Sequence, residues 1–235
     1  MDHLDDDLDR VGLLGDALRR SLYAYVAAQP DPVSREQAAT ALGLALHTAR
    51  FHLDRLVEAG LLEVELRQLS GRRGPGAGRP SKIYRRSARQ LSVSLPERRY
   101  DLAGEVLAEA VDRSVRAGSP VAAVLPAVAH EVGRRLGEQA SGPRAVGGTG
   151  GEAASELATA AGVLAGLGYE PVVADTEVAL ANCPFDRLAA GHTELVCGLN
   201  RHLVAGVLEG AEVPGLEARL APHDGMCCVR VGAPR

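Results

Sequence analysis

Residues 34–65 have the sequence "SREQAATALGLALHTARFHLDRLVEAGLLEVE", and this stretch decides the fold of the N-terminal part of the chain. Ser34 with Gln37 three residues later forms a capping box, which predicts the start of a short helix over 35–42. Apolar periodicity predicts a second helix over about 45–59, and a glycine follows each of the two helices. Two helices joined by a glycine turn predict a helix-turn-helix.

The flanking residues extend this unit on both sides. Apolar residues at three- and four-residue spacing predict one helix over 9–28. On the other side, residues 61–69, "LLEVELRQL", alternate between apolar and charged side chains, as in a strand. The glycine-rich segment 70–81, "SGRRGPGAGRPS", predicts a loop before a return strand at 82–86. A hairpin of this kind after a helix-turn-helix predicts a winged helix.

On the second helix His47, Arg50, Phe51 and Asp54 share one face, which lies opposite the apolar face. A helix fits the major groove of DNA and presents such a face to the base edges. We expect His47, Thr48 and Arg50 to contact DNA, with Arg50 on a guanine or a phosphate. For the wing we expect phosphate or minor-groove contacts from Arg72, Arg73, Arg79 and Lys82.

Charge supports this hypothesis. Residues 1–90 hold 14 Lys+Arg and 12 Asp+Glu, a net of +2, whereas residues 91–235 hold 12 and 18, a net of −6. Between Leu66 and Pro96 there are eight basic residues and no acidic one. A basic stretch in a mildly acidic protein calls for an anionic partner. The alternative is a solvated basic loop on a small helical domain that binds protein.

The remainder of the chain predicts a second domain over 95–235. Two long Ala-, Val- and Leu-rich helices are expected over 100–117 and 121–140, and a glycine-rich loop follows. Further elements are expected as helices over 152–167 and 193–210 and as two pairs of short strands, the last of which contains "MCCVRV". The fold class is therefore mainly α with small β-hairpins (α+β): a winged helix-turn-helix over 8–90 and an α+β sensor domain.

All four cysteines lie in the last quarter of the chain, at 183, 197, 227 and 228. The acidic start of the chain is unlike a signal peptide, and no apolar run is long enough for a membrane span, so we expect a cytoplasmic protein. In that compartment clustered cysteines are more often metal ligands or redox centres than structural disulfides. Neighbours in a strand point to opposite faces, so one of Cys227 and Cys228 is expected to serve a metal centre.

The side chains around each cysteine select the ligands. Cys227 shares a face with Val229 and Val231, and so with the buried side, which makes Cys227 the third ligand and Cys228 the runner-up. Cys183 and Cys197 are the other two, and Cys197 lies near a helix N-terminus that favours a thiolate. The fourth ligand is left open between an external ligand and His192, His202, His223 or Asp186. Buried cysteines that merely act as small hydrophobes are the alternative.

Two resemblances add to these predictions. The stretch quoted first, with "GRPSKIYRRS" at 78–87, resembles the ArsR-like winged-helix regulators over residues 8–88. That resemblance implies a dimeric transcriptional regulator bound to double-stranded DNA with two-fold symmetry.

The pattern "NCPF…LVCGLN…CCVRV" resembles the sensor half of the SufR group of iron–sulfur repressors. It implies an iron–sulfur cluster on Cys183, Cys197 and Cys227, whereas the SufR group often has another cysteine where residues 198–226 have none.

We therefore expect a homodimeric DNA-binding repressor that senses redox or iron–sulfur status, and no enzyme. The cofactor is expected to be an iron–sulfur cluster, with zinc or no metal as alternatives. One rival is a winged-helix regulator that senses a small apolar metabolite, with the cysteines only lining its pocket. Another rival is an enzyme with Cys197 as nucleophile, for which the sequence offers no identifiable base.

Overall fold

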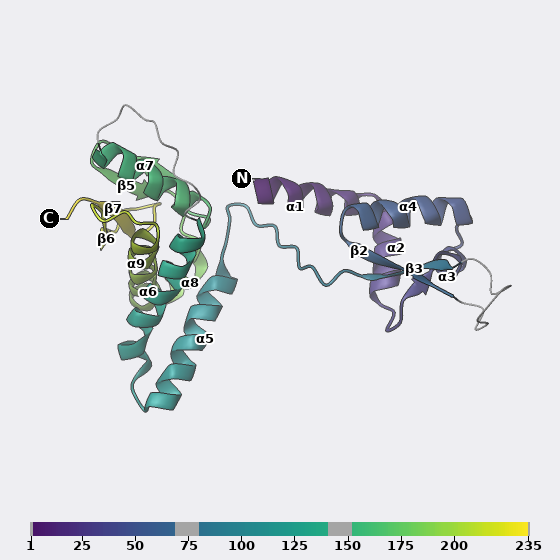
Figure 1. The fold of residues 1–235 in the computed structure, drawn as a ribbon, viewed down its shortest axis with the longest axis horizontal. Helices are drawn as coiled ribbons and strands as arrows, with labels where there is room; N and C mark the ends of the chain where they lie inside the picture. The colour runs from purple at the N-terminus through teal and green to yellow at the C-terminus, as the bar shows by residue number, and fades with distance from the viewer. Residues whose placement is uncertain (1, 69–79, 141–151, 235) are drawn as a thin grey trace. The chain divides into compact units, whose positions relative to one another are not determined.

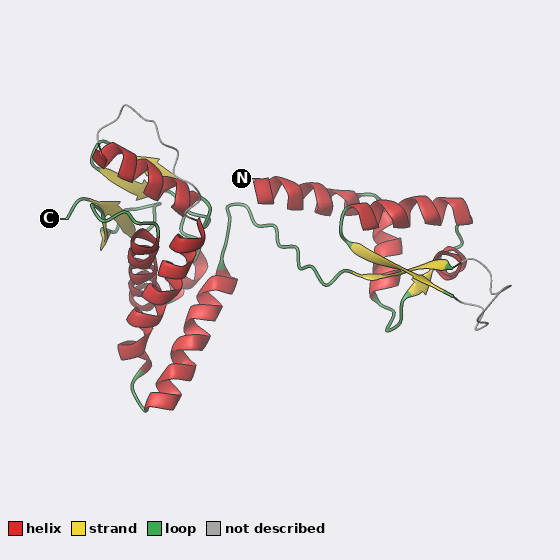
Figure 2. Ribbon diagram, in the orientation of Figure 1, coloured by secondary structure: helices red, strands yellow, loops and turns green. Residues whose placement is uncertain are grey.

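The computed structural model describes residues 2–68, 80–140 and 152–234. Within it the chain forms two compact units, Met1–Val93 and Ser94–Arg235. Each unit has its own small antiparallel sheet and its own helices (Figures 1 and 2). This architecture confirms the predicted α+β class with an N-terminal helix-turn-helix.

The N-terminal unit, called the head below, begins with helical segments α1 (Asp2–Gly12), η1 (Leu13–Gly15) and α2 (Ala17–Ala27). The prediction of one continuous helix over 9–28 was wrong. The Asp16 carboxylate accepts a hydrogen bond from the backbone N–H of Arg19 at 2.9 Å and so caps a new helix. Because an N-cap residue has extended backbone angles, the chain turns at this point.

The helix-turn-helix itself consists of α3 (Arg35–Ala41) and α4 (Leu46–Glu58). The predicted capping box is confirmed: the Gln37 N–H donates to the Ser34 hydroxyl at 3.2 Å, and the Gln37 side chain accepts from the Ser34 N–H at 2.8 Å. Gly43, between the helices, has a φ of +63°, a left-handed conformation that favours glycine. The sequence therefore determines this turn locally.

The sheet of the head has the order β1-β3-β2, formed by β1 (Val33–Ser34), β2 (Leu62–Arg67) and β3 (Ser81–Arg86). The predicted hairpin is confirmed, with Val64 opposite Tyr84 in the antiparallel register. Sequence reasoning missed β1, since a two-residue strand has no periodicity. Buried side chains from α2, α3, α4 and the sheet form the core of the head, among them Leu22, Ala38, Leu53, Leu62 and Tyr84.

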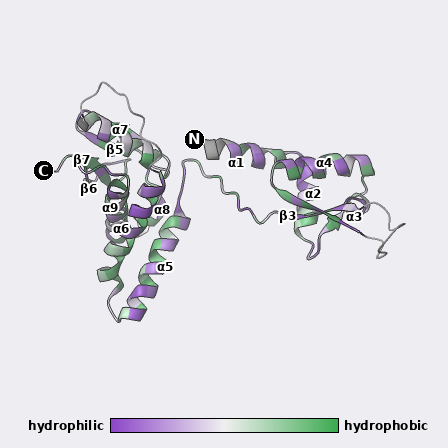
Figure 3. Cartoon of the chain, viewed as in Figure 1, coloured by the Kyte–Doolittle hydropathy of each residue, from purple (hydrophilic) through white to green (hydrophobic). Residues whose placement is uncertain are grey.

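Three long helices dominate the C-terminal domain: α5 (Tyr100–Ala117), α6 (Val121–Ala140) and α9 (Thr193–Gly210). All three have the bounds that the sequence predicted. Helices α6 and α9 run side by side, and Figure 3 shows apolar and polar residues alternating along α5. Helices α6 and α9 meet through glycines. A Cβ added to Gly133 would overlap the carbonyl of Leu203, and one added to Gly206 would overlap the carbonyl of His130.

A four-stranded antiparallel sheet completes this domain, in the order β4-β5-β7-β6. Its strands are β4 (Pro171–Val173), β5 (Glu177–Leu180), β6 (Glu217–Leu220) and β7 (Val229–Gly232). One core lies between this sheet and helices α7 (Glu152–Ala165) and α9. A second core joins α5, α6, α9 and the short α8 (Asp186–Gly191). Of the helices that the structure describes, none combines the length and the apolar character that a membrane span requires.

Candidate DNA-binding surface and cysteine site

The outer face of α4 carries three exposed side chains, His47, Arg50 and Phe51, while Thr48 is half-buried. Arg50 and Phe51 are exposed to 64% and 61%. The opposite face packs into the core of the head through Ala49, Leu53 and Leu56. The sequence therefore predicted correctly which side of α4 points outward. The structure holds no DNA, so the predicted contacts of His47, Thr48 and Arg50 stay predictions.

Asp54 connects this face of α4 to the hairpin. Its carboxylate accepts hydrogen bonds from Lys82 Nζ at 2.9 Å and from the Tyr84 hydroxyl at 3.0 Å, and Arg50 Nε lies 3.8 Å away. Burial alone would raise the pKa of Asp54, but the Lys82 and Tyr84 hydrogen bonds lower it below the usual value. Asp54 therefore stays ionised and holds Lys82, a predicted DNA contact, against α4.

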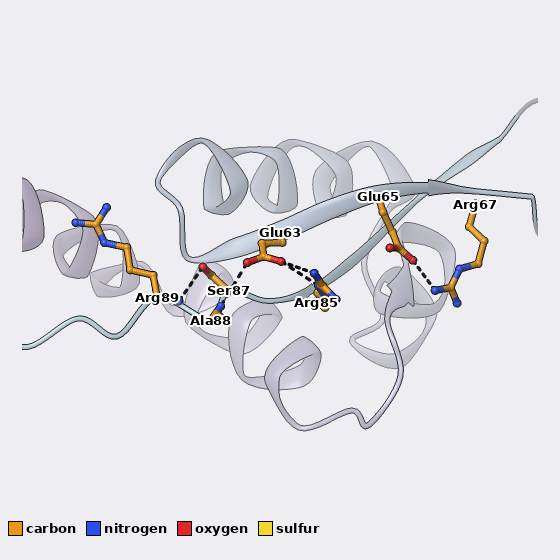
Figure 4. A network of polar contacts seen from close by, with 7 residues as sticks. All are labelled: Glu63, Glu65, Arg67, Arg85, Ser87, Ala88 and Arg89. Carbon is orange, nitrogen blue, oxygen red and sulfur yellow. Dashed lines mark hydrogen bonds and ion pairs between the residues drawn. The ribbon is translucent and has the colours of Figure 1, made fainter.

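Acidic partners neutralise much of the basic segment of the head. On β2 and β3, Arg85 pairs with Glu63 at 2.7 Å and Arg67 pairs with Glu65 at 2.5 Å (Figure 4). Arg89 lies 3.4 Å from Asp7. These acids lie outside the basic stretch in the sequence, so counting charges along the chain overstated its positive potential. The predicted wing contacts Arg72, Arg73 and Arg79 lie outside the described residues.

In the C-terminal domain the four cysteines form two pairs. Cys197, in the second turn of α9, is joined by a disulfide to Cys228, with their Cα atoms 6.3 Å apart. Cys183 and Cys227 are free, and each lies near enough to the other to shift the pKa of its thiol. Because Cys227 and Cys228 are adjacent, the two pairs meet. The predicted set Cys183, Cys197 and Cys227 is thus divided, and the runner-up Cys228 is the partner of Cys197.

Cys227 and Cys228 lie just before β7, not within it as the sequence suggested. The chain still alternates there: Cys227 is 2% exposed and packs with Val229 and Val231, while Cys228 is half-buried. The expectation that Cys227 faces the core is confirmed. Gly225, with a φ of +73°, lies in the turn before the cysteines. The Cys227 N–H then donates to the Leu180 carbonyl at 2.9 Å, and the Cys228 carbonyl accepts from the Ala221 N–H at 2.8 Å.

The free pair is polarised. The hydrogen bond from Cys227 lowers the pKa of the Cys183 thiol below its usual value, although burial opposes the shift, and the Phe185 N–H adds to the lowering. The same hydrogen bond, together with burial, raises the pKa of Cys227. Of the two thiols, Cys183 is therefore the one whose surroundings favour the charged form.

Two buried polar side chains complete the surroundings of the sulfur atoms. Asn200 Nδ2 donates to Cys227 Sγ at 3.2 Å, and Asn200 Oδ1 accepts from the Tyr169 hydroxyl at 2.5 Å. Asn200 lies three residues after Cys197 on α9, so both reach the same side of the helix. Sequence reasoning missed Asn200 and Tyr169, although the spacing from Cys197 was a usable signal.

The loop that holds Cys183 is hydrogen-bonded to Glu97 and Arg98, at the start of the C-terminal domain. We call this start of the domain its entrance. Asn182, 5% exposed, donates from Nδ2 to the carbonyls of Glu97 at 3.0 Å and Gly168 at 2.7 Å. Arg98 donates to the Cys183 carbonyl at 2.9 Å and also to the Asn182 side chain. The segment 97–99 follows directly on the connection from the head. We call these contacts the entrance clamp.

The four cysteine side chains are of the chemical type that binds an iron–sulfur cluster. Their arrangement in this structure does not form such a site. Four cysteine sulfurs are the ligands that such clusters use. Within residues 2–68, 80–140 and 152–234, however, no group of three or more His, Cys, Asp or Glu side chains is placed to hold a metal ion. Two of the four sulfurs are bonded to each other, so all four could serve as thiolate ligands only after this disulfide is reduced.

The structure also bears on the rival predictions. A shallow groove of about 450 Å³ lies along α7, and its lining consists of Ala140, Ala158, Thr159, Gly162, Val163, Gly166 and Leu167. None of these is a cysteine, so this groove is not the cysteine-lined pocket of the metabolite alternative. Cys197 is 6% exposed and disulfide-bonded, which argues against its use as an enzyme nucleophile.

The comparisons with known proteins concern the head. Residues 14–65 match the family model of a helix-turn-helix domain. This match supports a DNA-binding transcriptional regulator and so the coarser part of the ArsR-like resemblance. No curated protein and no solved structure matches the chain. The resemblance of the C-terminal half to the SufR group therefore stays a prediction.

Proposed function

We propose that the protein is a homodimeric regulator of transcription in the cytoplasm whose DNA affinity depends on the oxidation state of its four cysteines. The match of residues 14–65 supports the DNA-binding part. The convergence of all four cysteines on one site, which the entrance clamp ties to the connection with the head, supports the sensing part. Cytoplasmic disulfides are usually transient and redox-sensing.

The reversible step is the Cys197–Cys228 bond. A cellular dithiol reductant gives two electrons and two protons to this disulfide, leaves two thiols, and becomes a disulfide itself. In the reduced protein the ligands proposed for an iron–sulfur cluster are Cys183, Cys197 and Cys227, with Cys228 as the runner-up to Cys227 and the fourth position open. A bound cluster supplies one-electron redox chemistry. The Asn200 amide and the Arg98 guanidinium contribute a hydrogen-bond donor and a positive charge beside the sulfur site.

The entrance clamp is the proposed route from the cysteines to DNA. Any rearrangement of Cys183 moves its own carbonyl and the neighbouring Asn182, which hold Glu97 and Arg98. A shift of 97–99 changes the start of α5 and the connection to the head. The sensor then alters DNA affinity by favouring one dimer geometry over another, provided that the two oxidation states stabilise the two geometries differently.

An exposed stripe on α5 supports the homodimer. Gly104, Ala108, Val111 and Val115 recur at spacings of four, three and four residues, and the two valines are 48% and 76% exposed. An a/d spacing of this kind is typical of helix pairing. Two copies would bind a two-fold DNA site. Sedimentation of Val111→Glu alongside wild type tests this part, and a wild-type monomer would contradict it.

The decisive experiment is purification without oxygen, followed by determination of iron, sulfide and zinc per chain in wild type and Cys197→Ser. Iron with matching sulfide, lost in the variant, would support the cluster. Zinc alone would replace it by a thiol–zinc site. DNA affinity is then compared before and after oxidation, with Cys228→Ser as a second variant. Equal affinity in both states would contradict redox sensing while leaving DNA binding intact.

A further inference from the structure

The centre of the outer face of α4 is an aromatic side chain. At about 100° per residue, Phe51 lies about 40° from His47, whereas the core residue Leu53 lies about 160° from Phe51, on the opposite side of the helix. Phe51 is 61% exposed, and Leu53 is completely buried. Phe51 therefore lies opposite the buried face of α4 and not at the border of that face. An aromatic ring left in water forgoes a large burial energy, so its place suggests a partner.

The ring is supported from one side only. The His52 imidazole packs edge-on against it, with ring centroids 5.1 Å apart and an interplanar angle of 79°. This contact restricts the ring without covering it. Phe51 thus presents a fixed apolar surface, which costs less rotamer freedom on binding than a flexible side chain would.

The charges around Phe51 indicate which partner it fits. Arg50, its neighbour, is 64% exposed and lies 3.8 Å from Asp54, and Arg55, one turn further, is 51% exposed and pairs with Glu58 at 3.1 Å. Both guanidinium groups are accessible enough to exchange these carboxylates for phosphates. Lys82 is held on the adjacent strand by Asp54. The Phe51 ring thus lies among basic side chains on a helix, and a helix is narrow enough to enter the major groove of DNA. Such a surface would fit a partner that is anionic along its edges and has apolar groups between them. The major groove of DNA is such a surface, and its apolar points are the thymine methyl groups.

We propose that Phe51 contacts the C5-methyl group of a thymine in the major groove and so sets one base preference of the operator. This inference rests on the proposed DNA-binding function and adds a residue that polar recognition by His47, Thr48 and Arg50 does not include. Each subunit of a dimer contributes one Phe51. Two thymines at symmetric positions are therefore specified by contact with an apolar ring.

The test removes single methyl groups. The full chain first selects its preferred duplex from a random pool, and each thymine of that duplex is then replaced by deoxyuridine. At the contacted thymine, wild type should lose about fourfold in affinity, the effect of exposing one methyl-sized group. Phe51→Ala should bind the thymine duplex more weakly and lose nothing further on the uracil duplex. Arg50→Ala is the matched control, since it weakens binding but keeps the fourfold uracil effect.

Three outcomes separate the possible failures. Equal uracil losses in wild type and Phe51→Ala would overturn the Phe51 contact while DNA binding stands. Unchanged affinity of Phe51→Ala for the selected duplex would also overturn it. Selection of no duplex at all would overturn the DNA-binding function and the contact together. A thermal melt and circular dichroism spectrum of Phe51→Ala, which we expect to equal wild type, exclude misfolding, and Phe51→Leu provides a second variant that keeps an apolar contact.

Discussion

The head and the C-terminal domain keep their functional groups in opposite places. In the head, His47, Arg50 and Phe51 lie on an exposed helix face, and the core behind them consists of other residues. In the C-terminal domain, Cys197 and Cys227 are themselves buried, and Cys183 packs against both cores of that domain. The exposed face of the head can therefore vary in sequence without loss of the fold, whereas chemistry at the cysteines necessarily changes the packing of the C-terminal domain.

Gly206→Ala should give the largest effect, because the new Cβ would overlap the carbonyl of His130 and force α6 and α9 apart. We expect a loss of about 3 kcal/mol in the unfolding free energy of the C-terminal domain. Chemical denaturation followed by circular dichroism measures it. Gly198→Ala is the control on the same helix, since nothing lies within 4 Å of that added Cβ. A Gly206→Ala protein as stable as wild type would show that this helix contact is looser than described.

Asn182→Ala tests the entrance clamp. It leaves the carbonyls of Glu97 and Gly168 without their donor, which should cost about 2 kcal/mol. The readout specific to the clamp is hydrogen exchange at the amide of Arg99, which donates to the Pro184 carbonyl at 3.0 Å. We expect exchange to speed up there and not in the head. Unchanged exchange would mean that the cysteine loop does not control this segment.

Arg50→Ala should separate function from stability in the head. Its side chain is 64% exposed, and its Nε lies 3.8 Å from the Asp54 carboxylate, which is too far for a hydrogen bond. We therefore expect no change in melting temperature. Affinity for the selected duplex should fall about tenfold. The salt dependence decides the role: a slope reduced by about one unit indicates a phosphate contact, and an unchanged slope indicates a base contact. Full affinity in this variant would remove Arg50 from the interface.

Glu63→Gln should give the smallest effect. Glu63 holds Arg85 on the hairpin, where both side chains are solvent-accessible, so stability should not change measurably. Removing its negative charge beside a DNA-binding surface should raise affinity about twofold at low salt and not at high salt. Titrations of the duplex at two salt concentrations measure this. Weaker binding at low salt would show that Glu63 positions Arg85 for DNA.

The two units also differ in how far the sequence determines their sites. Ser34, Gln37 and Gly43 lie within ten residues of one another, so the helix-turn-helix follows from local signals and was predictable. The pairing of Cys197 with Cys228 depends on how α9 meets a turn thirty-one residues later, and spacing alone offered no means to choose it over Cys227. The break at Asp16 was locally encoded but was hidden by apolar periodicity that continues through it.

The glycine contact between α6 and α9 also has a consequence for evolution. Gly133, Gly137, Gly206 and Gly210 each face backbone of the opposite helix, so almost any mutation at these codons adds atoms where there is no room. Replacing a cysteine by a smaller side chain such as alanine adds no atoms, so the cysteines can drift once their chemistry is no longer selected. Distant descendants of this domain should therefore be recognised by four glycines on two helices, including descendants that have lost every cysteine.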